Sequence, residues 1–180
     1  MSAQMPDVLL YDGERLPLLS NPLESYWDIA NPRARFVSNC SGLWRGYVAT
    51  YAIEADTLYF IDIEGTVAVD DTGRVLTING QGPVDEAGRL RVAEEEDGDE
   101  LAFDTYPNED RMVAVTIDML FPGCAGWVKA SWFSGELRVG QGELIRGVSM
   151  GYQSVYEREL FLAIQQGRII DRLLVDNTST

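Results

Sequence analysis

The stretch WRGYVATYAIEADTLYFIDI, residues 44–63, decides the fold class of this chain. Its two arms, 44–53 and 58–63, are rich in aromatic and β-branched side chains, which are enriched in β-strands. The four residues between the arms read EADT, a segment short enough to join two antiparallel strands. The stretch therefore predicts a β-hairpin.

The same pattern of two strand-forming arms around a turn recurs on both sides of this stretch. Asp12-Gly13 is a strong two-residue turn signal between the arms 8–11 and 15–19. We expect three further hairpins, and their arms are 67–69 with 75–78, 127–133 with 136–139, and 160–164 with 168–175. Turn signals at such regular spacing predict a mainly antiparallel sheet.

Helical segments are expected to be few and short. Asn21 is a residue type that caps helices and Pro22 suits a first helical turn, so we expect a helix there that stops before Asn31-Pro32. A second short helix is an alternative around 109–119, although 113–117 fits a strand better. The predicted fold class is α+β, a curled sheet or partial barrel built from antiparallel hairpins with one or two short helices.

A length of 180 residues indicates a single domain over 1–180. Residues 79–110 differ in composition from the rest, and we interpret them as an excursion from the sheet whose tip is the acidic run 94–100. An EF-hand loop with Gly98 at its sixth position would place Ala93 at the first, where an oxygen ligand is required. The run is therefore interpreted as a solvated loop or a docking site, and not as a calcium site.

The balance of charges restricts the partners of the chain. It has 14 basic and 29 acidic side chains, a net charge of −15, and Lys129 is its only lysine. Such a surface repels phosphate backbones, so nucleic-acid binding is not expected, whereas the same field speeds association with a basic protein. The chain contains no histidine, which excludes Ser-His-Asp and Cys-His catalysis and histidine-ligated metal sites.

Cysteine usage and hydropathy bear on the compartment. Cys40 and Cys124 have neither the spacing of a zinc site nor that of a redox CxxC motif. The first residues lack the basic region of a signal peptide, and the apolar runs are too short to span a bilayer. We expect a cytoplasmic, reduced protein that has no metal, cofactor or membrane association.

These features favour a non-catalytic protein that binds a basic protein partner. A concrete version is an inhibitor similar to a bacterial immunity protein or antitoxin, whose acidic surface covers a basic effector. The acidic excursion supplies the candidate partner-binding residues. They are Glu94, Glu95, Glu96, Asp97, Asp99 and Glu100.

The alternative is a small-molecule or carbohydrate-binding protein, or a weak enzyme based on paired carboxylates such as Glu136 and Glu143. Arg45 and Arg138, if placed on neighbouring strands, would clamp a carboxylate or phosphate. In the competing interpretation each arginine stacks on an aromatic ring and pairs with a glutamate such as Glu136. The candidate pocket consists of Trp44, Arg45, Trp132, Glu136, Arg138 and Tyr152. The sequence also leaves open whether the chain forms a homo-oligomer.

Several short motifs carry a resemblance to a known group of proteins. They are WRGY at 44–47, WFSGELRV at 132–139, GE at 142–143, GY at 151–152 and YE at 156–157. Together they resemble an uncharacterised family of small bacterial cytosolic proteins, over about residues 8–63 and 127–164 of this chain. The resemblance implies a bacterial source and one compact domain, and it brings no activity or catalytic residue. The family pattern has a proline in the turn after the second block, where this chain has Gly140.

Overall fold

The computed structural model describes residues 5–27, 33–37, 41–43, 45–77, 111–124, 126–146 and 154–179. The whole acidic excursion, residues 79–110, lies outside this part of the chain, as do Cys40, Trp44 and Tyr152. None of the helices in the described part is both long and apolar enough to cross a membrane.

Strands dominate the described part of the chain, where they form one nine-stranded sheet. The strands are β1 (Asp7–Tyr11), β2 (Glu14–Leu18), β3 (Tyr47–Glu54), β4 (Thr57–Ala68), β5 (Met112–Ala114), β6 (Val128–Lys129), β7 (Gly135–Arg146), β8 (Val155–Gln165) and β9 (Arg168–Asp176). The helical elements are the 3₁₀ helices η1 (Pro22–Tyr26) and η2 (Ser41–Leu43) and the single turn α1 (Ile117–Leu120).

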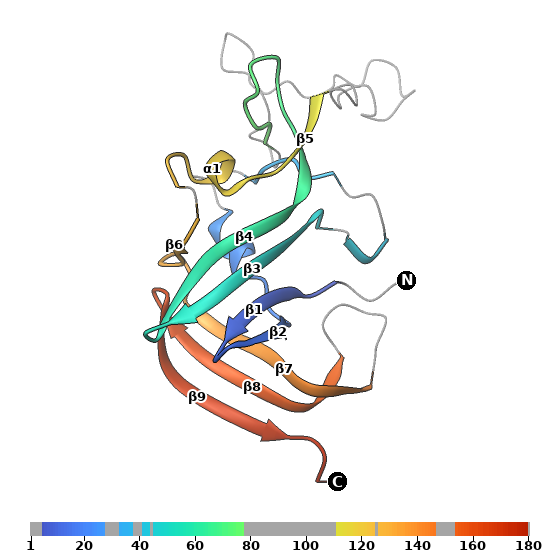
Figure 1. Cartoon of the computed structure of the whole chain (residues 1–180), viewed down its shortest axis with the longest axis vertical. Coiled ribbons are helices and arrows are strands. Elements are labelled where there is room, and N and C mark those ends of the chain that lie inside the picture. Colours follow the sequence, from blue (N-terminus) through green and yellow to red (C-terminus); the bar gives the residue numbers. More distant parts are fainter. Residues whose placement is uncertain are drawn as a thin grey trace, which may run out of the picture.

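The sheet curls on itself and does not close into a regular barrel (Figure 1). From β4 the pairing runs through β3, β1, β2, β7 and β8 to β9, which returns to β4 at the single residue pair Thr57 and Arg168. Beyond this pair β9 diverges from β4, and in Figure 1 its far end lies well away from β4 while it stays beside β8. Among the described strands β1 and β3 are parallel, and the other pairs are antiparallel. The predicted fold class is confirmed.

Three tight turns account for the hairpins that the sequence predicted most clearly. They join β1 to β2 through Asp12-Gly13, β3 to β4 through Ala55-Asp56, and β8 to β9 through Gln166-Gly167. Both central residues of each turn have positive φ, for example 50° at Ala55 and 59° at Asp56. This geometry has the twist that two antiparallel strands need when only two residues connect them.

The inward faces of the strands bury the apolar core. Tyr47, Tyr51 and Phe60 are the largest side chains that are fully buried. They alternate with outward-facing residues, as the two-residue period of a strand requires. Tyr26, Phe121 and Trp132 pack together at ring-centroid distances of 4.7–5.4 Å, and Phe121 joins them to Phe60 at 5.7 Å.

The hairpin predicted at 127–139 is wrong. The first arm supplies only the two-residue strand β6, which pairs with β4, whereas β7 starts at Gly135 and pairs with β8. In the segment between β6 and β7 the backbone forms two short-range hydrogen bonds, from Ser131 N to the Lys129 carbonyl and from Phe133 N to the Ala130 carbonyl. β7 gains the much longer ladder with β8, and the local turn does not determine its partner. Gly140, for which the family resemblance implied a turn, lies inside β7 opposite Glu159.

The predicted helices are present only as short turns. Residues 22–26 form a 3₁₀ helix with Pro22 in its first turn, and the Asn21 side chain does not cap it. The segment around 109–119 contains both predicted alternatives, strand β5 followed by the turn α1, whose N-cap Thr116 accepts a bond from Met119 N. The hairpin predicted around 70–73 is reduced to an isolated bridge between Val69 and Val75.

Candidate functional site

Of the predicted site residues, the structure describes Arg45, Trp132, Glu136 and Arg138. The six acidic partner-binding residues, with Trp44 and Tyr152 of the candidate pocket, lie outside the described residues. Arg45 directly precedes β3, whereas Arg138 lies on β7, and β1 and β2 separate these strands in the sheet. The condition for the anion clamp, that the two arginines lie on neighbouring strands, is therefore not met.

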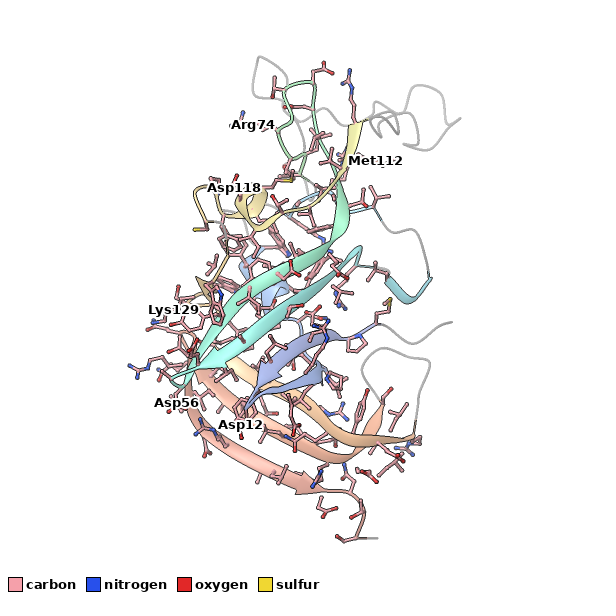
Figure 2. All side chains as sticks on the ribbon, viewed as in Figure 1. Asp12, Asp56, Arg74, Met112, Asp118 and Lys129 are labelled. Carbon is pink, nitrogen blue, oxygen red and sulfur yellow. The ribbon has the colours of Figure 1, made fainter. Side chains whose placement is uncertain are left out.

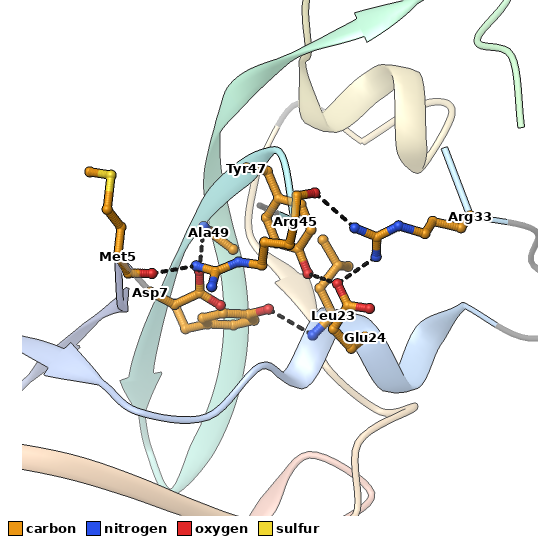
Figure 3. A network of polar contacts seen from close by, with 9 residues as sticks. Met5, Asp7, Leu23, Glu24, Arg33, Arg45, Tyr47 and Ala49 are labelled. Atoms are coloured by element: carbon orange, nitrogen blue, oxygen red, sulfur yellow. Dashed lines mark hydrogen bonds and ion pairs between the residues drawn. The ribbon is translucent and has the colours of Figure 1, made fainter. Parts of the chain in front are cut away.

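Arg45 lies in a buried ion pair (Figure 3). Its guanidinium donates to Asp7 Oδ1 at 2.6 Å and to the Met5 carbonyl at 3.0 Å, and it lies 5.1 Å from the centre of the Tyr47 ring. The side chains of Arg45 and Asp7 are 1% and 0% exposed. Asp7 Oδ1 also accepts a bond of 2.8 Å from Ala49 N, so one carboxylate connects the start of β1 to β3.

Burial dominates the electrostatics of this pair. It raises the pKa of Asp7 from 3.8 to about 7, although the Arg45 charge and the Ala49 N–H both favour the ionised carboxylate. Asp7 Oδ2 is buried and has no hydrogen-bond partner among the described residues. Burial likewise raises the pKa values of Tyr47 and Tyr51 far above their ordinary value, so both phenols stay protonated.

A chain of hydrogen bonds extends from this pair to the first 3₁₀ helix. The Tyr47 hydroxyl donates to Glu24 Oε1 at 2.7 Å, and Arg33 bridges Glu24 to the Arg45 carbonyl. The Tyr51 hydroxyl accepts a bond of 2.9 Å from Leu23 N. Figure 3 shows that these polar groups point toward one another. The network therefore fastens η1 to β3, and its role is structural.

The remaining described pocket residues each bind different neighbours. Trp132 stacks on Phe121 and donates its indole N–H to the Pro22 carbonyl at 2.9 Å. Arg138 forms an ion pair with Glu159 on β8 and donates to the Ser154 carbonyl at 2.7 Å. Glu136, which the sequence suggested as an arginine partner, is exposed on β7. None of the four lines the hollow described next.

The hollow lies at the end of the sheet where the tight turns gather, and we call it the turn-end hollow. It is lined by residues 10–13, 52–56, Trp127 and Arg172 and has a volume of about 610 Å³. Its position follows from the parallel pairing of β1 with β3, which sets Leu10 opposite Ala52 and brings the two following turns together. In Figure 2, Asp12 and Asp56 lie near each other on the left side of the molecule.

The lining of the turn-end hollow combines acids, aromatic rings and one cation. Asp12, Glu54 and Asp56 contribute carboxylates, and Arg172 reaches from β9 to form an ion pair with Asp56. Hydrogen bonds to Asp56, and then to Tyr11, raise the pKa of Arg172 above its ordinary value. Trp127 is 56% exposed and packs edge-on against Tyr59 at 5.5 Å. Among the described residues no group of three acids or cysteines is placed to hold a metal ion.

A second feature is an apolar stretch on the last strand. Ile170, Leu173 and Leu174 of β9 are 63%, 60% and 56% exposed. The register with β8 places Leu173 opposite Phe161 and Leu174 opposite Leu160, so the two leucines lie on opposite faces of the sheet. Within the described sheet, this part of β9 pairs with β8 alone.

Reasoning from the sequence missed both features. The Asp12-Gly13 and 54–57 turns were recognised, but the parallel contact between β1 and β3 that brings them together is not visible in local patterns. The sequence also assigned Trp127 to a hairpin arm. For the exposed apolar residues of β9, the sequence does contain a signal. The run IIDRLLV at 169–175 does not alternate between apolar and polar residues as a half-buried strand does.

Comparison of the chain with known protein families, with curated proteins and with solved structures found no match.

Proposed function

We propose that this chain is a non-catalytic protein-binding protein whose partner is a basic protein. The observation that carries the proposal is the apolar outer strand β9, with Ile170, Leu173 and Leu174 each more than half exposed. Exposed apolar side chains that cluster on one element mark interaction surfaces more often than isolated ones do.

The pairing of β9 supports a docking role for this strand. On its side toward β4, Ile169 N still donates to the Asp56 carbonyl, and from Ile170 onward β9 has no strand partner there within the described sheet. A strand edge of this kind offers backbone groups to an added strand, while neighbouring apolar side chains give affinity. The Asp171 carboxylate accepts a bond of 2.9 Å from Arg172 N, so one edge donor is satisfied from within the chain.

The charge of the chain supports a basic partner. A net charge of −15 attracts positively charged proteins over distances of about one Debye length, roughly 10 Å at moderate salt. The same charge opposes association of two copies of this chain. An inhibitor that resembles an immunity protein and covers a basic effector fits both the charge and the apolar strand.

The experiment compares two variants with the unchanged chain as bait in a cell lysate at low salt. Leu173→Ser/Leu174→Ser removes two of the three exposed apolar side chains of β9, one from each face of the sheet, and Leu144→Ser/Ile145→Ser is the matched control. Leu144 and Ile145 are 51% and 52% exposed at the end of β7. Circular dichroism first checks that both variants are folded.

We expect a basic protein to be retained by the unchanged chain and by the control, released by salt, and lost from the β9 variant. Equal retention by all three chains would overturn docking on β9. A dimer of the unchanged chain in light scattering that the β9 variant abolishes would assign this strand to self-association, against the proposal.

A further inference from the structure

We propose that the turn-end hollow is a binding site for a guanidinium group, supplied by an arginine side chain of the partner. The source of that arginine rests on the proposed function, whereas the affinity of the hollow for the group does not. Four observations carry the inference: the way the hollow is built, the guanidinium it already holds, its unpaired carboxylates, and the position of Trp127.

The hollow is built by the core of the sheet. β1 and β3 run in parallel, and their registers set Val8, Leu9 and Leu10 opposite Thr50, Tyr51 and Ala52. The residues that follow these paired positions, 11–13 and 53–56, must therefore lie side by side. The buried bonds of Asp7 to Arg45 and Ala49 fix the start of the same pairing. The walls of the hollow are thus held by tight turns on rigid strands, which suits a binding site.

One guanidinium already occupies part of the hollow. Arg172 crosses from β9 to pair with Asp56, and hydrogen bonds to Asp56 and Tyr11 raise its pKa. The walls therefore fit a planar cation with several N–H donors. The carboxylate and the phenol can both accept hydrogen bonds from such a group.

Two carboxylates of the hollow are left over. Asp12 and Glu54 line it, and neither forms an ion pair within the described part of the chain. Three acids against the single charge of Arg172 leave the lining with a net charge of 1 − 3 = −2. A second cation would be attracted by this charge, and the open volume of about 610 Å³ falls in the range of ligand sites.

Trp127 supplies an aromatic surface at the same place. Its backbone has φ of 46°, a conformation that bulky residues rarely adopt, and it holds a half-exposed indole against the hollow. Arginine is the cation that stacks best on aromatic rings, and its pairing with a carboxylate is bidentate. The lining of the hollow therefore offers an arginine side chain both an aromatic ring and carboxylates that form no ion pair within the described residues.

The experiment uses the full chain and two small probes. N-acetyl-arginine amide is titrated into ¹⁵N-labelled protein, and the indole N–H signal of Trp127 is followed by NMR. N-acetyl-citrulline amide, which has nearly the same shape and no charge, is the matched ligand. Trp127→Phe assigns the signal.

We expect a saturable shift with the arginine probe in the millimolar range and none with the citrulline probe. Asp12→Asn/Glu54→Gln should weaken binding about two- to tenfold, because each exposed contact of this kind contributes a modest free energy. Both residues lie at exposed turn positions, and asparagine tolerates the positive φ of Asp12.

The control Asp62→Asn/Glu64→Gln removes the same two charges from exposed positions on β4, outside the lining of the hollow. If both double variants weakened binding of the arginine probe equally, net charge alone would explain the effect, and the proposed site would be wrong. A shift that does not saturate, or an equal response to citrulline, would do the same. Since no partner is present, this result is independent of the β9 capture experiment.

Discussion

Asp7 and Arg45 are 38 positions apart in the sequence, and their carboxylate and guanidinium meet at 2.6 Å in a place that water does not reach. The contact fixes the start of β1 beside β3, the parallel pair of the described sheet. Because the turns after these two strands form the turn-end hollow, a buried ion pair at one end of the strands positions an exposed site at the other.

Removing one partner of this pair should be costly. At pH 8, Arg45→Met removes the charge and the hydrogen bond that favour the ionised form of Asp7, so this carboxyl group must stay buried without its partner or take up a proton, and we expect a loss of roughly 3–5 kcal/mol in the free energy of unfolding. Urea denaturation measures this loss. The double variant Asp7→Leu/Arg45→Met should recover much of it, since it leaves no buried charge. A single variant within about 0.5 kcal/mol of the unchanged chain would contradict the role of the pair.

The pH dependence of stability should carry a signature of Asp7. Its pKa is about 7 in the folded chain against an ordinary value of 3.8, so the folded state holds this proton more tightly than the unfolded state does. The associated stability is complete below about pH 4 and is lost as the pH rises to about 7.

Comparison of Asp7→Asn with the unchanged chain isolates this contribution. As the pH rises through that window, the unchanged chain should lose stability relative to the variant, as measured by urea denaturation at fixed salt. Asp62→Asn, which removes an exposed carboxylate from β4, should show no such change. Parallel curves for Asp7→Asn and the unchanged chain would show that Asp7 does not titrate in this range.

Gly65 should not tolerate a side chain. A Cβ there would lie 2.7 Å from the Gly46 carbonyl oxygen and 3.2 Å from Tyr47 Cβ, and the Gly46 backbone has little freedom to move because it directly precedes the ladder that starts at Tyr47. We expect Gly65→Ala to destabilise the chain by about 1–3 kcal/mol in thermal or urea unfolding. Thr66→Ala on the same strand is the control, and an equal effect of both would rule out the close approach as the cause.

Glu159 should matter more than Glu136 to the end of β9. Glu159 pairs with Arg138 and accepts a bond of 3.0 Å from Asn177 Nδ2, whereas Glu136 is exposed. Glu159→Ala should cost about 1–3 kcal/mol, because it leaves a largely buried arginine without its carboxylate. It should also speed hydrogen exchange at the Asn177 amide, which donates to the Glu157 carbonyl. The same loss from Glu136→Ala would contradict this assignment.

Local chemistry in the sequence was sufficient for much of the fold. Asp12-Gly13, the 54–57 segment and the 165–167 segment each predicted a hairpin, because turn residues and flanking strand formers act over a few positions. The hairpin at 134–135 failed because the partner of β7 is β8, whose ladder is longer than any that the segment 127–133 offers.

The candidate site depended on contacts that local patterns do not contain. Arg45 was chosen for its position between Trp44 and Gly46, but the residue that determines its role, Asp7, comes from another strand. Arg138 was expected to pair with a glutamate such as Glu136, and it pairs instead with Glu159 on β8. The alternative interpretation, in which each arginine has an aromatic or acidic neighbour within the protein, describes these two residues better than the clamp.

The single Thr57–Arg168 pair that joins β9 to β4 also sets how the molecule bears load. A force applied at Asn177, perpendicular to β9, would break the β8–β9 residue pairs one after another. Within the described sheet, β8 is the strand that β9 pairs with along most of its length. On the opposite side the first contact to resist would be the ion pair of Arg172 with Asp56, followed by the bond from Ile169 N to the Asp56 carbonyl and by the Arg168 pair beside the turn. Detachment of β9 would thus be gradual, and it would open the ring that β9 closes while leaving the pairings from β4 through β3, β1, β2 and β7 to β8 in place.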